Sequence, residues 1–93
     1  MKFEWDEAKN RSNIRKHGFD LADAEEMLAG ILFARPDTRE DRWVGIRMIR
    51  GCVAVVAFAE RDPDTIRIIS LRKASQNERR QYAKAIENEL ETR

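Results

Sequence analysis

Residues 52–59 limit the possible folds of this chain more than any other stretch. Their sequence, CVAVVAFA, contains no charged residue. A strand without alternating polar residues must be covered on both faces, which places it in the middle of a sheet. Gly51 marks a hairpin with a strand at residues 43–50, and the polar turn at residues 60–64 leads into a strand that begins at Thr65. We therefore expect antiparallel strands on both sides of the central one.

The rest of the chain predicts a first short strand, three helices and one further strand. Phe3 and Trp5 alternate with a polar residue, and Asp6 then caps a helix that runs to about Lys16 and stops at Gly18. This first helix is poor in apolar residues. We expect its contribution to the core to come from Ala8, Ser12 and Ile14.

A second helix, capped by Asp20, is expected to end at Gly30, with Leu21, Ala24, Met27 and Leu28 facing inward. A strand at residues 31–34 and a polar loop at residues 35–42 follow. The last helix covers residues 76–91. Its apolar side is formed by Tyr82, Ala83, Ile86 and Leu90.

This order predicts a single α+β domain over residues 1–93. It combines a small antiparallel β-sheet with an N-terminal helical hairpin and a C-terminal helix, and we expect the helices on one face of the sheet. A lone Cys52 and a single histidine provide neither a disulfide framework nor a zinc-ligand set. The sequence shows no membrane span and no signal peptide, so we expect a cytoplasmic protein.

Charge is segregated along the chain although the net charge is only +1. Residues 9–16 hold four cations and no acid, and residues 65–84 hold six cations and one acid. The second cluster surrounds a strand-to-helix junction, in which Ser75 and Glu78 have the spacing of a capping box. Cations beside a helix N-terminus favour an anion, so the junction is either a phosphate cradle or a solvated rim. Arg67, within an apolar run, lies either on an open sheet face or beside a carboxylate.

Because no carboxylate pair has metal-binding spacing and the chain has one histidine, we expect any phosphodiester chemistry to proceed without a metal or other cofactor, which is feasible for RNA. The 2′-hydroxyl of RNA can act as the nucleophile, and the protein must then stabilise charge and move protons. The candidate catalytic residues are Lys16, His17, Arg72 and Arg79, and the candidate RNA-binding residues are Arg15, Arg67, Lys73, Arg80 and Tyr82. Lys73, Glu60 and Tyr82 are further candidates for proton transfer.

The sequence resembles the BrnT family of bacterial toxins. The residues that carry the resemblance are FEWD at 3–6, Lys9, the run Asn13-x-x-Lys16-His17-Gly18, Arg42, Glu60-Arg61 and RIISLRKASQNERRQY at 67–82. The resemblance implies a RelE-like fold and a ribonuclease that stops translation. It also implies a BrnA-like ribbon-helix-helix antitoxin as partner. The toxin would reach operator DNA only through this antitoxin, and no membrane partner is implied. The alternative is a non-catalytic module that binds nucleic acid or protein, including a degenerate toxin that retains only antitoxin binding.

Overall fold

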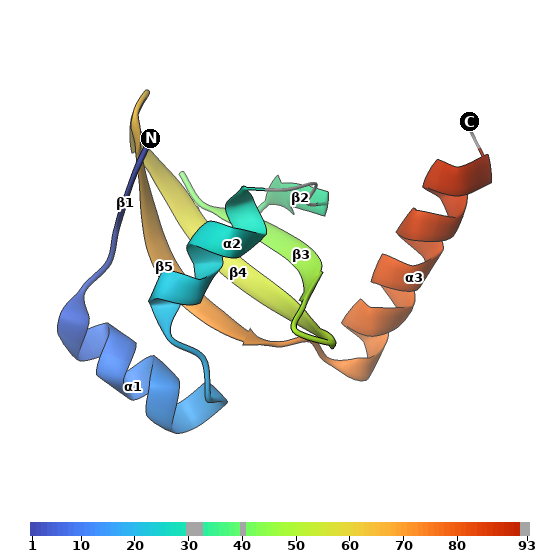
Figure 1. Ribbon diagram of the computed structural model, residues 1–93. Helices are drawn as coiled ribbons and strands as arrows, with labels where there is room; N and C mark the ends of the chain where they lie inside the picture. Colours follow the sequence, from blue (N-terminus) through green and yellow to red (C-terminus); the bar gives the residue numbers. More distant parts are fainter. Residues whose placement is uncertain (30–32, 40, 92–93) are drawn as a thin grey trace.

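The computed structural model describes residues 1–29, 33–39 and 41–91 and forms a five-stranded sheet with helices on both sides (Figure 1). The strand order is β1-β5-β4-β3-β2. In chain order the elements are β1 (Lys2–Glu4), α1 (Glu7–His17), the 3₁₀ helix η1 (Leu21–Asp23), α2 (Ala24–Leu28), β2 (Phe33–Pro36), β3 (Trp43–Ile49), β4 (Cys52–Asp62), β5 (Thr65–Lys73) and α3 (Gln76–Glu91).

The central position predicted for residues 52–59 is confirmed, because β4 pairs antiparallel with both β3 and β5. The expectation of a purely antiparallel sheet is wrong at one edge, where β1 pairs parallel to β5 and Phe3 lies opposite Ile66. Parallel neighbours need a long connection, and the helices and strands between β1 and β5 provide one. The α+β class itself is confirmed.

The two faces of the sheet differ in what covers them. The face under η1 and α2, which we call the covered face, carries the core, in which Leu21, Met27 and Val56 are fully buried. Side chains on the opposite face, the open face, come from alternate positions. In the register of the sheet, Arg72, Val55, Ile46 and Phe33 form one row across four strands, and Ser70, Ala57, Val44 and Arg35 form the next.

Two asparagines, rather than the apolar residues predicted, hold α1 in place. Ile14 is 42% exposed and Ala8 is exposed, whereas Asn10 and Asn13 are buried. The Asn13 amide donates to the carbonyl oxygen of Leu71 at 2.8 Å, and its oxygen accepts the Leu71 N–H at 3.2 Å. The Asn13 side chain therefore bonds the edge of β5 as a neighbouring strand would, at a position beyond the residues of β5 that pair with β1.

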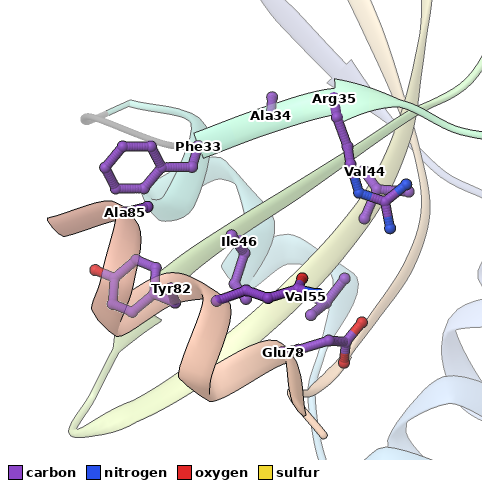
Figure 2. Close-up of a pocket in the computed structure, with 10 residues that line it drawn as sticks. Phe33, Ala34, Arg35, Val44, Ile46, Val55, Glu78, Tyr82 and Ala85 are labelled. Atoms are coloured by element: carbon purple, nitrogen blue, oxygen red, sulfur yellow. The ribbon is translucent and has the colours of Figure 1, made fainter. Parts of the chain in front are cut away.

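The prediction that all helices share one face is wrong for α3. The side chains of α3 approach Phe33 and Ile46, which belong to the open face (Figure 2). The apolar side predicted for α3 is also largely unburied, with Ile86 37% and Leu90 66% exposed. Side chains of α3 as far as Ala85 line a groove against the sheet, and the helix then continues away from the sheet (Figure 1).

Several expected boundaries shift or fall outside the described residues. Strand β2 continues to Pro36, so the polar loop begins later than expected. The expected helix end at Gly30 and the first two residues of the strand at 31–34 lie outside the described part of the chain. Among the helices that the structure describes, none combines the length and apolar character needed to cross a membrane.

Candidate RNA site on the open sheet face

The strand-to-helix junction at the end of β5 is organised by a single carboxylate. The predicted capping box is confirmed: the Ser75 N–H donates to Glu78 Oε1 at 2.8 Å, and the Glu78 N–H donates to Ser75 Oγ at 3.2 Å. Arg72 donates to both oxygens of the same carboxylate, at 2.7 and 2.9 Å. Glu78 thus fixes the start of α3 and the orientation of Arg72 at once.

The ion pair shifts the pKa of both partners. The Arg72 hydrogen bonds, the Ser75 N–H and the Arg72 charge together lower the pKa of Glu78 from its usual 4.5 to about 2, against the opposing effect of burial. The same bond to Glu78 raises the pKa of Arg72. Both groups therefore remain charged throughout the neutral pH range.

Arg72 retains hydrogen-bonding capacity beyond this pair. A guanidinium carries five N–H donors. Two contact Glu78, and Nη1 also approaches the Lys73 carbonyl oxygen at 3.3 Å. The remaining two donors, at Nε and Nη2, form no hydrogen bond with any residue in the described ranges and are available to another acceptor. A planar fork held rigidly on one side and open on the other suits a phosphate oxygen.

Arg72 pairs with Val55 in the sheet and bonds to Glu78, and both of these partners line a groove between the sheet and α3. Figure 2 shows this groove. The groove encloses about 190 Å³. Its floor is apolar, with Val44, Ile46 and Val55 from the sheet, and its polar groups are Arg35, Glu78 and Gln81. Tyr82 closes one end, where its ring meets Phe33 edge-on at a centroid distance of 5.9 Å. An apolar floor with a few polar groups is typical of a ligand site.

Arg67 lies on the same face and combines the two alternatives that the sequence left open. Its Nη1 donates to Glu4 Oε2 at 2.6 Å, and its side chain is still 36% exposed. Arg61 also contacts Glu4, at 3.2 Å. Arg67 is therefore both paired with a carboxylate and accessible from the open face.

The structure brings only some of the sequence-predicted site residues together. Arg67, Arg72 and Tyr82 share the open face, and Arg79 is tied to the junction because its Nη1 donates to the Ala74 carbonyl oxygen at 3.0 Å. Lys73 and Arg80 are exposed near the junction, at the end of β5 and on the first turns of α3.

A second group is separate from the junction in the chain and lies at the end of α1. It consists of the exposed residues Arg15, Lys16 and His17. Gly18, with a φ of 75°, ends the helix directly after them. No contact joins these three side chains to Arg72 within the part of the chain described.

Strand β2 contributes two groove residues that the sequence did not assign to the site. Phe33 was expected in the strand at 31–34 and Arg35 in the polar loop after it, and β2 places both on the open face, opposite Ile46 and Val44. The two-residue spacing of Phe33 and Arg35 is the spacing of side chains on one face of a strand. The pattern covers too few residues to predict a strand by itself. Across the residues that the structure describes, no group of three or more His, Cys, Asp or Glu side chains is placed to hold a metal ion.

Comparison with known proteins identifies the family. A family model described as the ribonuclease toxin BrnT of type II toxin-antitoxin systems matches residues 5–78. The chain belongs to the BrnT family. The crystal structure of the Brucella abortus ribonuclease toxin BrnT is 38% identical, has a TM-score of 0.66, and is matched over 82% of this chain and 99% of its own. A comparison with curated proteins gave no match.

Membership of the BrnT family defines the general activity. The family consists of ribonuclease toxins, so it implies an RNA substrate and an antitoxin partner. The matched segment ends at Glu78 and thus contains Arg67 and Arg72 together with all of α1. Most of α3 lies beyond the matched segment, including Tyr82.

Proposed function

We propose that this BrnT family member cuts RNA on the open face of the sheet without a metal ion, and thereby inhibits translation in the cytoplasm. The observation that carries the proposal is the orientation of Arg72 by Glu78 beside a groove with an apolar floor. A guanidinium fixed before the substrate arrives stabilises developing charge without reorganising in the transition state. Arg72 is therefore the residue to which we assign charge stabilisation.

In the proposed reaction the RNA supplies its own nucleophile. The 2′-oxygen attacks the adjacent phosphorus and loses its proton to a base, while the bond from phosphorus to the 5′-oxygen breaks and that oxygen gains a proton. The products are a 2′,3′-cyclic phosphate and a 5′-hydroxyl end. Arg72 would contact a phosphate oxygen that becomes more negative, and Arg79 would add positive charge at the start of α3.

Proton transfer is assigned to the end of α1. Lys16 follows Lys9 by seven residues, so both leave the same side of the helix. Lys9 lines a hollow on the open face, so this side of α1 faces the open face of the sheet. We propose Lys16 and His17 as the proton-transfer residues, with Arg15, Arg67, Lys73 and Arg80 binding RNA phosphates and Tyr82 stacking on a base.

We further propose that a ribbon-helix-helix antitoxin covers this region and represses the operon together with the toxin. Exposed apolar side chains near the groove support a protein partner. Tyr82, Ile86 and Leu90 recur every four residues along α3, and Met48, which is 52% exposed, lies beside Tyr82. Such a stripe is the kind of surface that an amphipathic segment covers.

The test of cleavage uses the purified chain with RNA in the presence of a metal chelator. We expect new 5′-hydroxyl and 2′,3′-cyclic phosphate ends, and we expect Arg72→Ala to abolish them. Arg50→Ala is the matched control, because Arg50 also forms an ion pair, with Asp23 at 2.9 Å, but lies at the turn between β3 and β4. Cleavage by folded Arg72→Ala at the wild-type rate would refute the assignment. Cleavage that the chelator abolishes would refute metal independence.

A growth experiment tests the cellular part of the proposal. Expression of the chain alone should arrest a bacterial host, and co-expression with an adjacent gene for a ribbon-helix-helix protein should restore growth. Arrest that Arg72→Ala does not relieve would separate toxicity from the proposed site. Binding of RNA without any cleavage would instead favour a non-catalytic module.

A further inference from the structure

A second hollow on the open face is lined by cations from three separate parts of the chain. It encloses about 150 Å³ and includes Lys9 from the first turns of α1, Arg42 from the residue before β3, and Arg67 from β5. Ala59 of β4 forms part of its floor, and Asp6 lies at its edge. We call this hollow the Arg42 pocket. Convergence of cations from distant parts of the chain is unusual for a solvated rim, because like charges repel.

The charges of the Arg42 pocket are only partly compensated. Arg67 pairs with Glu4, whereas the side chains of Lys9 and Arg42 form no ion pair with any residue in the described ranges. Asp6 is the only acid among the described residues that line the pocket, and it is occupied as the cap of α1, where its Oδ1 accepts the Lys9 N–H at 2.9 Å. That backbone bond, with the Lys9 and Arg67 charges, lowers the pKa of Asp6.

We call the groove between the sheet and α3, beside Arg72, the Arg72 groove. The Arg42 pocket and the Arg72 groove lie along one surface. Val55 belongs to the floor of the groove and Ala59 to the floor of the pocket, and both are on β4. Four residues of strand correspond to roughly 13 Å. Between them on the open face lie Ala57 and Ser70, which are paired in the sheet and too small to form a barrier. A short stretch of extended polynucleotide can therefore contact both sites.

We propose that the Arg42 pocket binds a backbone phosphate of the same RNA whose scissile phosphate contacts Arg72. This inference rests on the proposed function, and it adds Lys9 and Arg42 to the RNA-binding residues. Lys9 and Arg42 form no ion pair within the described residues, and the Arg67 side chain is 36% exposed. Such cations suit a phosphate, whose oxygens accept charge-assisted hydrogen bonds. The pocket reads no base, so it contributes affinity and register rather than sequence preference.

Binding of a cleavage-resistant oligonucleotide tests the proposal. The probe is a fluorescent RNA octanucleotide with 2′-O-methyl groups, and its affinity is measured by anisotropy over a range of salt concentrations. We expect Arg42→Ala and Lys9→Ala each to weaken binding about 10-fold. Each should also reduce the slope of log affinity against log salt by about 0.7 for one lost phosphate contact. Lys84→Ala, an exposed cation outside both sites, is the charge-matched control.

A second probe separates the pocket from a general charge effect. A dinucleotide has a single phosphate and cannot reach both sites. When it occupies the Arg72 groove, wild type and Arg42→Ala should bind it with the same affinity. Cleavage of longer RNA by Arg42→Ala should show a raised KM at an unchanged kcat, because the lost contact is not at the reacting phosphate.

Failure of this inference is distinguishable from failure of the proposed function. If wild type cuts RNA and Arg42→Ala matches the Lys84→Ala control in affinity, salt slope and KM, the pocket is refuted while the ribonuclease remains. If wild type binds the octanucleotide through Arg42 and Lys9 but never cuts RNA, the pocket is supported and cleavage is refuted. An absence of binding by wild type refutes the pocket.

Discussion

Substitution of Glu78 tests how one carboxylate supports both the junction and the Arg72 guanidinium. Glu78→Gln keeps an oxygen that can accept the Ser75 N–H but removes the charge that holds Arg72. Glu78→Ala removes both interactions. Comparison of the two variants therefore separates the ion pair from the helix cap.

The size of each effect follows from the geometry and the exposure. The lowering of the Glu78 pKa from 4.5 to about 2 sets a nominal upper limit of roughly 3 kcal/mol for the ion pair. The Arg72 side chain is 38% exposed, so water screens the pair and we expect about 1 kcal/mol. Loss of the cap in Glu78→Ala adds about 1 kcal/mol. Glu78→Gln should lower the Tm by roughly 4–8 °C, and Glu78→Ala by about twice as much.

The effect of Glu78→Gln depends on pH with a defined sign. The pKa of Glu78 is lower in the folded than in the unfolded protein, so its contribution to the free energy of unfolding is complete above the unfolded value of 4.5. That contribution is lost as the pH falls from 4.5 toward about 2. The stability difference between wild type and Glu78→Gln should therefore shrink on acidification.

Urea denaturation followed by circular dichroism, between neutral pH and pH 3, measures this difference. Glu87→Gln is the control, because Glu87 is an exposed glutamate on the same helix that does not line the groove. The reasoning is refuted if Glu78→Gln is as stable as the control at neutral pH. It is equally refuted if the stability loss in Glu78→Gln stays constant down to pH 3.

Three further predictions concern the scaffold and the partner surface. Asn13→Ala leaves the Leu71 backbone at the edge of β5 without its partner and should destabilise the fold by about 2–3 kcal/mol, measured by urea denaturation. Gly18→Ala should cost about 1 kcal/mol in the same assay, because φ is 75° there but no atom lies within 4 Å of an added Cβ. Leu90→Ser with Ile86→Ser should change stability by less than about 0.5 kcal/mol per site while weakening antitoxin binding measured by calorimetry, and unchanged binding would place the antitoxin elsewhere.

Local sequence patterns predicted those parts of the fold that depend on neighbouring residues. The apolar run at 52–59 predicted the central strand, and the spacing of Ser75 and Glu78 predicted the capping box. The inward stripe of the second helix is also confirmed, with Leu21 and Met27 fully buried. Such features are readable because periodicity and capping involve residues a few positions apart.

The contribution of α1 shows where this reading fails. Helix amphipathicity is judged from apolar residues, and α1 has few, so the pattern pointed to Ile14. The residues that face inward are Asn10 and Asn13, because the exposed edge of β5 and the turn after α1 need hydrogen-bond partners. A buried asparagine is recognisable only when the backbone groups that it satisfies are known.

The sequence by itself determined the central strand, the helix caps and the cations available for the proposed RNA site. Only the tertiary structure decided that β1 runs parallel to β5, that α3 lies over the open face, and that Arg42, Lys9 and Arg67 line one hollow. These outcomes depend on strand register and on packing between distant segments. A shift of one residue in register would turn every side chain of a strand to the opposite face, so the face that a cation occupies is a property of the assembled sheet.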